Sequence, residues 1–187
     1  MTNVPETLRA EHRDLLPHIQ QLRTVADCIG DIRDLAVETL LDEVLAFLTG
    51  HLLPHARAEE AVLYPAVASA MGAPEATRTM SRDHVEVEAL IEELSVLRAR
   101  LGTDAITSQM AKDLRRVLYG LYALVKVHFA KEEEVYLPLL DATLTPAAAD
   151  AMFASMARAA HADAAAQAAR SVSRSSDVAL GTSDHAR

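Results

Sequence analysis

Two stretches of the sequence share one pattern, and they decide the fold. The first is His55-Ala-Arg-Ala-Glu59-Glu60-Ala-Val-Leu-Tyr64-Pro65, and the second is His128-Phe-Ala-Lys-Glu132-Glu133-Glu134-Val-Tyr136-Leu-Pro138. In each stretch a His is followed four residues later by a Glu, and then by a Tyr and a Pro. Residues four apart lie about 6 Å apart on one face of an α-helix, so an imidazole and a carboxylate can converge there. The two stretches therefore predict two helices with matching polar faces.

The apolar residues around these stretches have helical spacing. They recur every three or four residues, as a single buried stripe on a helix requires. Glycines at 30, 72 and 102, and the pair Thr145-Pro146, mark the expected helix ends. The predicted helices span about residues 5–29, 32–70, 74–101 and 105–140. Because short turns join them, we expect an all-α, up-down-up-down four-helix bundle in which the second and fourth helices are parallel.

The chain is expected to form one bundle domain over residues 1–145. The Ala-rich segment 146–169 contains Met152, Phe153 and Met156 and predicts a short accessory helix that packs outside the bundle. Residues 170–187 are Ser-rich and have few large apolar side chains, which cannot offset the entropic cost of ordering. A flexible C-terminal tail is therefore expected there.

Composition limits the classes of partner and of site. A net charge of -9 disfavours nucleic acid and anionic membranes as partners. Cys28 is the single cysteine, which excludes an intrachain disulfide and a site with several thiolate ligands. The N-terminus lacks the pattern of a signal peptide, and no uncharged stretch approaches the roughly 20 residues that span a bilayer. We therefore expect a cytoplasmic protein, of undetermined oligomeric state.

Histidine and acid pairs at helical spacing exceed chance. Asp and Glu total 27 of the 187 residues, so about one of the eight histidines should have an acid four residues later at random. Three such pairs occur, namely His55/Glu59, His84/Glu88 and His128/Glu132. His12 and His84 are the inward-facing candidates on the first and third helices. Burying such groups without partners would cost several kcal/mol per charge, which predicts bound cations in the bundle interior.

The predicted ligand types limit the metal. Imidazole and carboxylate ligands without thiolate suit iron, with manganese and zinc as chemical alternatives. Glu59 and Glu132 lie on parallel helices and can bridge two ions. The residues alone therefore indicate a site for two metal ions.

The order His12, His55-x3-Glu59, His84, His128-x3-Glu132 resembles the H–HxxxE–H–HxxxE signature of the hemerythrin-like family, the HHE cation-binding proteins. The resemblance covers about residues 8–140. It implies a centre of two iron ions, bridged by oxo or carboxylate groups, with these six side chains as ligands. It also implies that the molecule handled is oxygen, nitric oxide, peroxide or iron itself.

Two positions depart from the oxygen-carrying members of that family. Those proteins would have a His where this chain has Glu88, and a His-x4-Asp where it has His128-x3-Glu132. We therefore include Glu88 among the predicted metal ligands. Added carboxylate should stabilise the ferric state, which favours catalase- or peroxidase-like chemistry over reversible oxygen carriage. A non-catalytic binding or sensing module and a zinc-stabilised structural bundle are the alternatives, so the sequence leaves open whether the chain is an enzyme.

Two more histidines lie near the predicted ligands. In the expected helix register His18 and His51 fall close to the level of Glu88. They are predicted to hydrogen-bond to the ligands, to relay protons or to replace a ligand. A buried, hydrogen-bonded pair without a chemical role is the alternative.

Prolines and tyrosines give further expectations. The string Leu-Leu-Pro-His occurs at 15–18 and 52–55, so Pro17 and Pro54 should each kink or loosen a helix. Tyr64 and Tyr136 are expected to pack at the bundle end. Tyr119 or Tyr122 would be the phenol that reaches the metals, although core packing is the more common role of a tyrosine.

Overall fold

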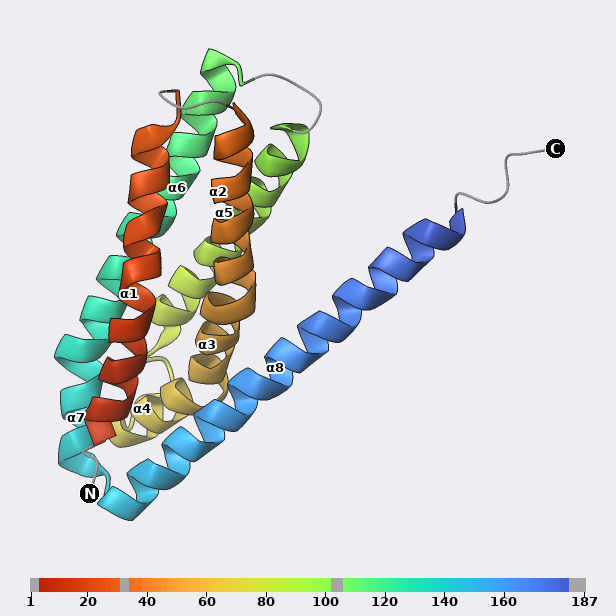
Figure 1. Cartoon of the computed structure of the whole chain (residues 1–187). Helices are drawn as coiled ribbons and strands as arrows, with labels where there is room; N and C mark the ends of the chain where they lie inside the picture. The colour runs from red at the N-terminus through yellow and green to blue at the C-terminus, as the bar shows by residue number, and fades with distance from the viewer. Residues whose placement is uncertain (1–3, 31–33, 102–105, 182–187) are drawn as a thin grey trace.

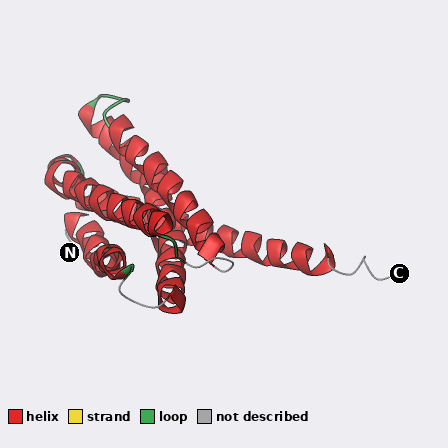
Figure 2. Cartoon of the chain, turned by 90° about the horizontal axis from the view of Figure 1, so that it is seen from above, coloured by secondary structure: helices red, strands yellow, loops and turns green. Residues whose placement is uncertain are grey.

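The structure is a computed structural model that describes residues 4–30, 34–101 and 106–181. Helices dominate the described residues, and no strand lies among them (Figure 2). The first helix is α1 (Val4–Cys28), and the third is α5 (Arg78–Leu101). The second helix runs through α2 (Asp34–Phe47), η1 (Leu48–Leu52), α3 (Leu53–Ala58), η2 (Glu59–Leu63) and α4 (Tyr64–Met71). The fourth runs through α6 (Ser108–Lys131), η3 (Glu132–Tyr136) and α7 (Leu137–Thr143), and α8 (Pro146–Gly181) follows.

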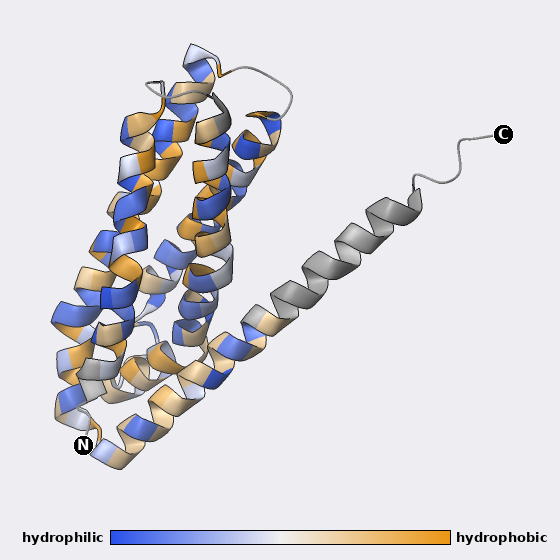
Figure 3. Ribbon diagram, viewed as in Figure 1, coloured by the Kyte–Doolittle hydropathy of each residue, from blue (hydrophilic) through white to orange (hydrophobic). Residues whose placement is uncertain are grey.

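The four long helices form an antiparallel bundle, which confirms the predicted all-α fold (Figure 1). Helix α1 packs against α2 and α6, and α5 packs against the same two helices. The second and fourth helices therefore lie diagonally opposite each other and run in the same direction. Hydrophobic and hydrophilic residues alternate around each helix of the bundle (Figure 3), as one buried stripe per helix requires.

Two of the predicted glycine turns are present. Gly72 follows α4 with a left-handed backbone (φ 62°), and its N–H bonds to the carbonyls of Ala68 and Ser69. Gly30 follows α1 with φ 94°. Only glycine adopts these angles without strain, so the two residues fix the ends of their helices. Gly102 lies outside the described residues.

Three widened turns interrupt the second and fourth helices. The segments η1, η2 and η3 are π-helical, and the residue after each donates its N–H to the carbonyl five positions earlier. The next residue is a proline in each case: Pro54, Pro65 or Pro138. Proline lacks an N–H and its ring clashes with the carbonyl four residues back, so a widened turn accommodates it. The loosening predicted at Pro54 is present, whereas α1 continues as an α-helix through Pro17.

The apolar core consists of two clusters. The larger lies between α1, α2, α5 and α6 and includes the fully buried Leu22, Leu94 and Leu118. The smaller gathers residues mainly of η2, α4, α7 and α8, among them Leu63, Leu140 and Phe153. Buried polar residues come from the turns of helix between the two clusters.

Helix α8 crosses the outside of the bundle. Met152, Phe153 and Met156 pack into the smaller cluster, as predicted for an accessory helix. The helix continues past the expected end at residue 169 to Gly181, through part of the Ser-rich segment in which a flexible tail was expected. Residues 182–187 of the predicted tail lie outside the described part of the chain. Neither α8 nor any other described helix combines the length and the hydropathy needed to cross a membrane.

Candidate metal centre

The bundle brings six of the predicted ligands into one polar layer, which we call the metal layer. Its members are His12 on α1, His55 on α3, Glu59 on η2, His84 on α5, His128 on α6 and Glu132 on η3. Five of them are buried, and His12, Glu59 and Glu132 have no exposed surface at all. His84 is partly exposed. The structure therefore brings these six side chains together from four different helices.

Glu59 lies between two groups that could each hold a metal ion. One group is Glu59 with His12 and His55, and the other is Glu59 with His84 and His128. Oε1 of Glu59 lies 2.9 Å from Nε2 of His55 and 3.8 Å from Nε2 of His12. Oε2 lies 3.3 Å from Nε2 of His84 and 4.0 Å from Nε2 of His128. The carboxylate thus presents one oxygen to each group, as a bridge between two metal ions would.

Glu132 repeats this arrangement from the opposite helix. Its Oε2 lies 3.4 Å from Nε2 of His12, in the first group. Its Oε1 lies 3.5 Å from Nε2 of His128, in the second group. Two carboxylates on parallel helices therefore span the same two groups of imidazoles.

Several atoms of the metal layer are buried without hydrogen-bond partners among the described residues. They are Nε2 of His12, Nε2 of His55, both carboxylate oxygens of Glu59 and Oε2 of Glu132. Buried polar atoms are rarely left unpaired, because each costs about 1–3 kcal/mol. All of these atoms are ligand types for iron, manganese or zinc, and all point into one layer. The donor set therefore fits bound metal ions.

A carboxylate holds the outer nitrogen of each imidazole in the layer. The distance between Nδ1 and a carboxylate oxygen is 3.1 Å for His12 and Glu133, and 3.4 Å for His55 and Glu11. It is 2.9 Å for His84 and Glu60, and 3.1 Å for His128 and Asp83. Such a contact favours the tautomer with the proton on Nδ1. The lone pair of Nε2 then points into the metal layer, where a cation would need it.

These four carboxylates form a ring around the bundle. Each carboxylate is the sequence neighbour of a predicted ligand and contacts a histidine on the next helix around the bundle. The contacts run from α1 to the second helix, from the second helix to α5, from α5 to α6, and from the fourth helix back to α1. Our sequence reasoning missed them, since acids are common in this chain. An acid adjacent to a predicted ligand on all four helices is the signal that could have identified them.

Glu88 is a correction to the predicted ligand set. Its side chain is exposed, and its carboxylate pairs with Arg57 at 3.3 Å. Glu88 lies one helical turn, about 6 Å, along α5 from His84. At that level its carboxylate is exposed and faces Arg57 instead of the layer that His84 enters.

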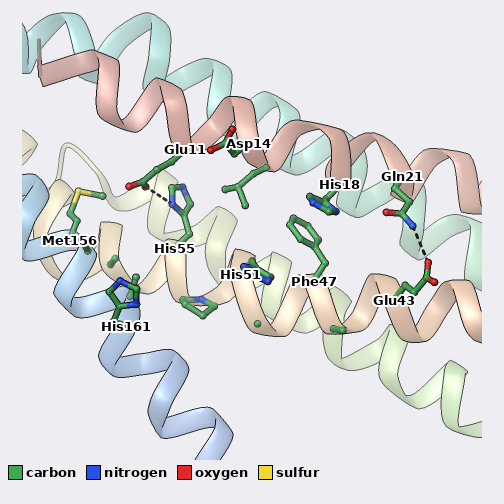
Figure 4. A pocket seen from close by; sticks show the side chains of 17 residues that line it. Glu11, Asp14, His18, Gln21, Glu43, Phe47, His51, His55, Met156 and His161 are labelled. Atoms are coloured by element: carbon green, nitrogen blue, oxygen red, sulfur yellow. Dashed lines mark hydrogen bonds and ion pairs between the residues drawn. The ribbon is translucent and has the colours of Figure 1, made fainter. Parts of the chain in front are cut away.

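His18 and His51 lie apart from Glu88 and are exposed, so the predicted relay of these three residues is not formed. Both line an open cavity beside the layer (Figure 4). The His18 ring stacks on the Phe47 ring, with the two ring centroids 4.6 Å apart. The ring centroids of His51 and Phe47 are 6.1 Å apart.

Tyr64 lies inside the metal layer, which corrects the expectation that it packs at the bundle end. Its hydroxyl donates to Oε1 of Glu132 at 2.9 Å and lies 3.1 Å from Nε2 of His128. In a π-helical turn residue i+5 comes to lie above residue i, so η2 turns Tyr64 toward the same side as Glu59. Burial and the nearby carboxylates raise the pKa of Tyr64 far above its usual value, so the phenol keeps its proton and donates it as a hydrogen bond.

The other tyrosines lie away from the layer. The hydroxyl of Tyr136 donates to the carbonyl of Ala76 at 3.2 Å, at the end of the bundle as expected. Tyr119 is 39% exposed and donates to Asp27. Tyr122 is partly exposed beside Lys126. The tyrosine that reaches the site is therefore Tyr64, which directly follows the widened turn η2.

The carboxylates hold protons on the imidazoles when metal is absent. Burial lowers the pKa of His12, but contacts with Glu132 and Glu59 outweigh it and raise the pKa to about 9. The same balance raises the pKa of His55 to about 10, mainly through Glu59, and that of His128 to about 10, mainly through Glu132. Burial alone would raise the pKa of Glu59. The charge of His55 and the contacts with His12 and His128 together have the larger effect and hold this pKa well below its usual value. Metal ions would displace these protons and take over the compensation of charge.

Fold and site together define a helical-bundle protein with a buried histidine and carboxylate module for metal binding. The family model described as the Hemerythrin HHE cation binding domain matches residues 3–140. Because the match covers most of the chain, the chain belongs to this family. No curated protein and no solved structure matches it.

The carboxylate ring predicts a loss of metal affinity when one member is removed. Replacing Glu60 with Ala should weaken metal binding about 10- to 100-fold, because His84 loses the contact that fixes its tautomer and orientation. Competition with a chelator, followed by metal analysis, measures the change. Glu88→Ala is the matched control on the facing helix and should leave affinity unchanged. Equal metal affinity in the two variants would contradict the role of the ring.

The raised pKa values predict how the metal-free chain responds to pH. His12, His55 and His128 retain protons up to about pH 9 to 10 when folded but only to about 6.5 when unfolded. The folded state binds more protons in this window, so the free energy of unfolding should fall by several kcal/mol as pH rises through it. Urea unfolding of the chelator-treated chain at several pH values measures this. The metal-loaded chain is the control, and a metal-free chain that stays equally stable from pH 6.5 to 10 would refute the account.

Proposed function

We propose that this chain holds a non-haem centre of two iron ions in the metal layer and uses it in catalase- or peroxidase-like turnover of hydrogen peroxide. The observation that carries the proposal is Glu59, a fully buried carboxylate whose two oxygens face different pairs of imidazoles. A bridging carboxylate between histidine-rich sites suits a pair of iron ions. The same donors accept zinc or manganese, so metal analysis is part of the test.

The residues divide into two terminal pairs and two bridges. His12 and His55 would hold one ion, and His84 and His128 the other. Glu59 and Glu132 would be shared between them. When bound, an iron pair supplies reversible electron transfer, which the side chains of this layer do not provide themselves.

The ring of carboxylates favours redox turnover over reversible oxygen carriage. Glu11, Glu60, Asp83 and Glu133 each contact a ligand imidazole through Nδ1. This contact makes the imidazole a stronger donor, which stabilises the more oxidised state of a metal. A centre that favours the ferric state therefore does not require Glu88 as a ligand.

Tyr64 is placed to donate a proton at the metal layer. Its hydroxyl lies within 3.4 Å of Nε2 of His84 and closer still to Nε2 of His128, and it stays protonated. Cleavage of the peroxide O–O bond requires a proton on each departing oxygen. A buried phenol beside the second pair of imidazoles can supply one and recover it from solvent.

The first test is metal content by mass spectrometry, together with the absorption spectrum before and after peroxide and with release of oxygen. We expect about two irons per chain, a near-ultraviolet charge-transfer band and sustained turnover. Two irons without turnover would point instead to a binding or sensing module. Zinc, or metal well below stoichiometric amounts, would overturn the di-iron proposal.

Tyr64→Phe removes the hydroxyl while retaining the ring in the core. We expect peroxide turnover to fall about 100-fold, the lower range for loss of a proton donor, with iron content unchanged. Tyr136→Phe removes a hydroxyl that bonds only to the backbone at the bundle end, and it should retain full turnover. A Tyr64→Phe chain as active as the Tyr136→Phe chain would exclude Tyr64 as the donor.

A further inference from the structure

An open cavity of about 900 Å³ lies beside the metal layer (Figure 4). Residues of α1, of the second helix from α2 to α3, and of α8 line it, with Met156 and His161 contributed by α8. Its size is within the range of small-molecule sites, which are concave, largely apolar and supplied with a few polar groups. The proposed peroxide chemistry does not need a cavity of this size, because peroxide is far smaller.

The cavity reaches the metal layer through one histidine. His55 lines the cavity, and its Nε2 lies 2.9 Å from Oε1 of Glu59 within the layer. Its Nδ1 lies 3.4 Å from Glu11, which lines the cavity as well (Figure 4). A molecule in the cavity is therefore separated from the metal layer by a single imidazole ring.

One wall of the cavity is a series of nearly parallel rings. The planes of His18 and Phe47 differ by 17°, and those of Phe47 and His51 by 18°. Both histidines are exposed, so their outer faces and edges are accessible from the cavity. Such a wall favours a planar ring, which can stack against it.

The charge of the lining determines which planar molecules fit. Within the described residues that line the cavity, carboxylates are present and Lys and Arg are not; the carboxylates are Glu11, Asp14 and Glu43. These groups repel anions and accept hydrogen bonds from O–H or N–H donors. Apart from His55, the residues that line the cavity belong to none of the groups in the described chain that could hold a metal ion. An uncharged aromatic with hydroxyl donors is the ligand that meets these conditions.

We propose that the cavity binds an aromatic reductant of the hydroquinone or catechol class, which rests on the proposed peroxide turnover. The reductant would lose two electrons and two protons to become a quinone. Hydrogen peroxide would accept the two electrons and two protons, its O–O bond would break, and two water molecules would form. The His55 ring lies between the two reactants and gives the electrons a short path. The cavity is open, so the two protons from the reductant can leave to solvent, and peroxide takes up two protons on its own side.

Gly50 allows a test that leaves the metal layer intact. It lines the cavity, and a Cβ added to it would meet nothing within 4 Å. Gly50→Phe should therefore fill the cavity without disturbing the helix. Titration calorimetry of 1,4-hydroquinone into the full-length, iron-containing chain without oxygen or peroxide should show binding, weakened at least tenfold in Gly50→Phe with iron content unchanged.

The control places the same ring outside the cavity. Ala162 on α8 is exposed and does not line the cavity, so Ala162→Phe should bind hydroquinone like the unaltered chain. No binding to the unaltered chain, or equal binding by Gly50→Phe, would overturn the proposal. Formation of quinone on adding peroxide separates the two proposals. Binding with neither quinone formation nor oxygen release would refute peroxide turnover but leave the cavity site. Binding with oxygen release but no quinone would overturn the role of the bound aromatic as reductant, and oxygen release without hydroquinone binding would refute the cavity site alone.

Discussion

The structure depends on the compensation of charge in the metal layer. Four imidazoles and two carboxylates lie between two apolar clusters, where water cannot solvate them. Isolated charges in such surroundings cost several kcal/mol each, so the layer needs either protons on its histidines or bound cations. The raised pKa values of His12, His55 and His128 correspond to the first case, protonated histidines without metal. Buried nitrogen and oxygen atoms without hydrogen-bond partners remain in the layer, and bound cations would pair with them.

This requirement also affects the backbone. Glu59 and Glu132 each begin a widened helical turn, and a proline follows each turn. Each of these prolines lacks the N–H of a regular α-helical hydrogen bond, and the widened turn before it accommodates the proline ring. The widened turn after Glu59 also brings the Tyr64 hydroxyl into the layer, so one backbone feature positions both a carboxylate and a proton donor. Widened turns of this kind often occur at functional sites.

The polar network extends from the layer to the surface on the side of α8. Four carboxylates on four helices fix the imidazoles, and one of them, Glu11, faces the open cavity. Arg57 binds Asp163 of α8 at 2.8 Å and Glu88 at 3.3 Å, which attaches α8 beside that cavity. The helix that the sequence suggested only as an accessory thus forms one wall of the proposed reductant site. The metal layer and the cavity therefore adjoin each other through His55.

The sequence alone determined the helical bundle and pointed to the six side chains that the structure brings into one layer, because helical spacing is local and each His-x3-Glu pair lies on one face of its own helix. It could not determine the rotation of each helix about its axis. The tertiary structure therefore decided that Glu88 turns to Arg57, that Tyr64 enters the layer, and that His18 and His51 line a cavity. It also decided the carboxylate ring, since each of its contacts joins residues of different helices, and the facing residue is set only when the helices pack.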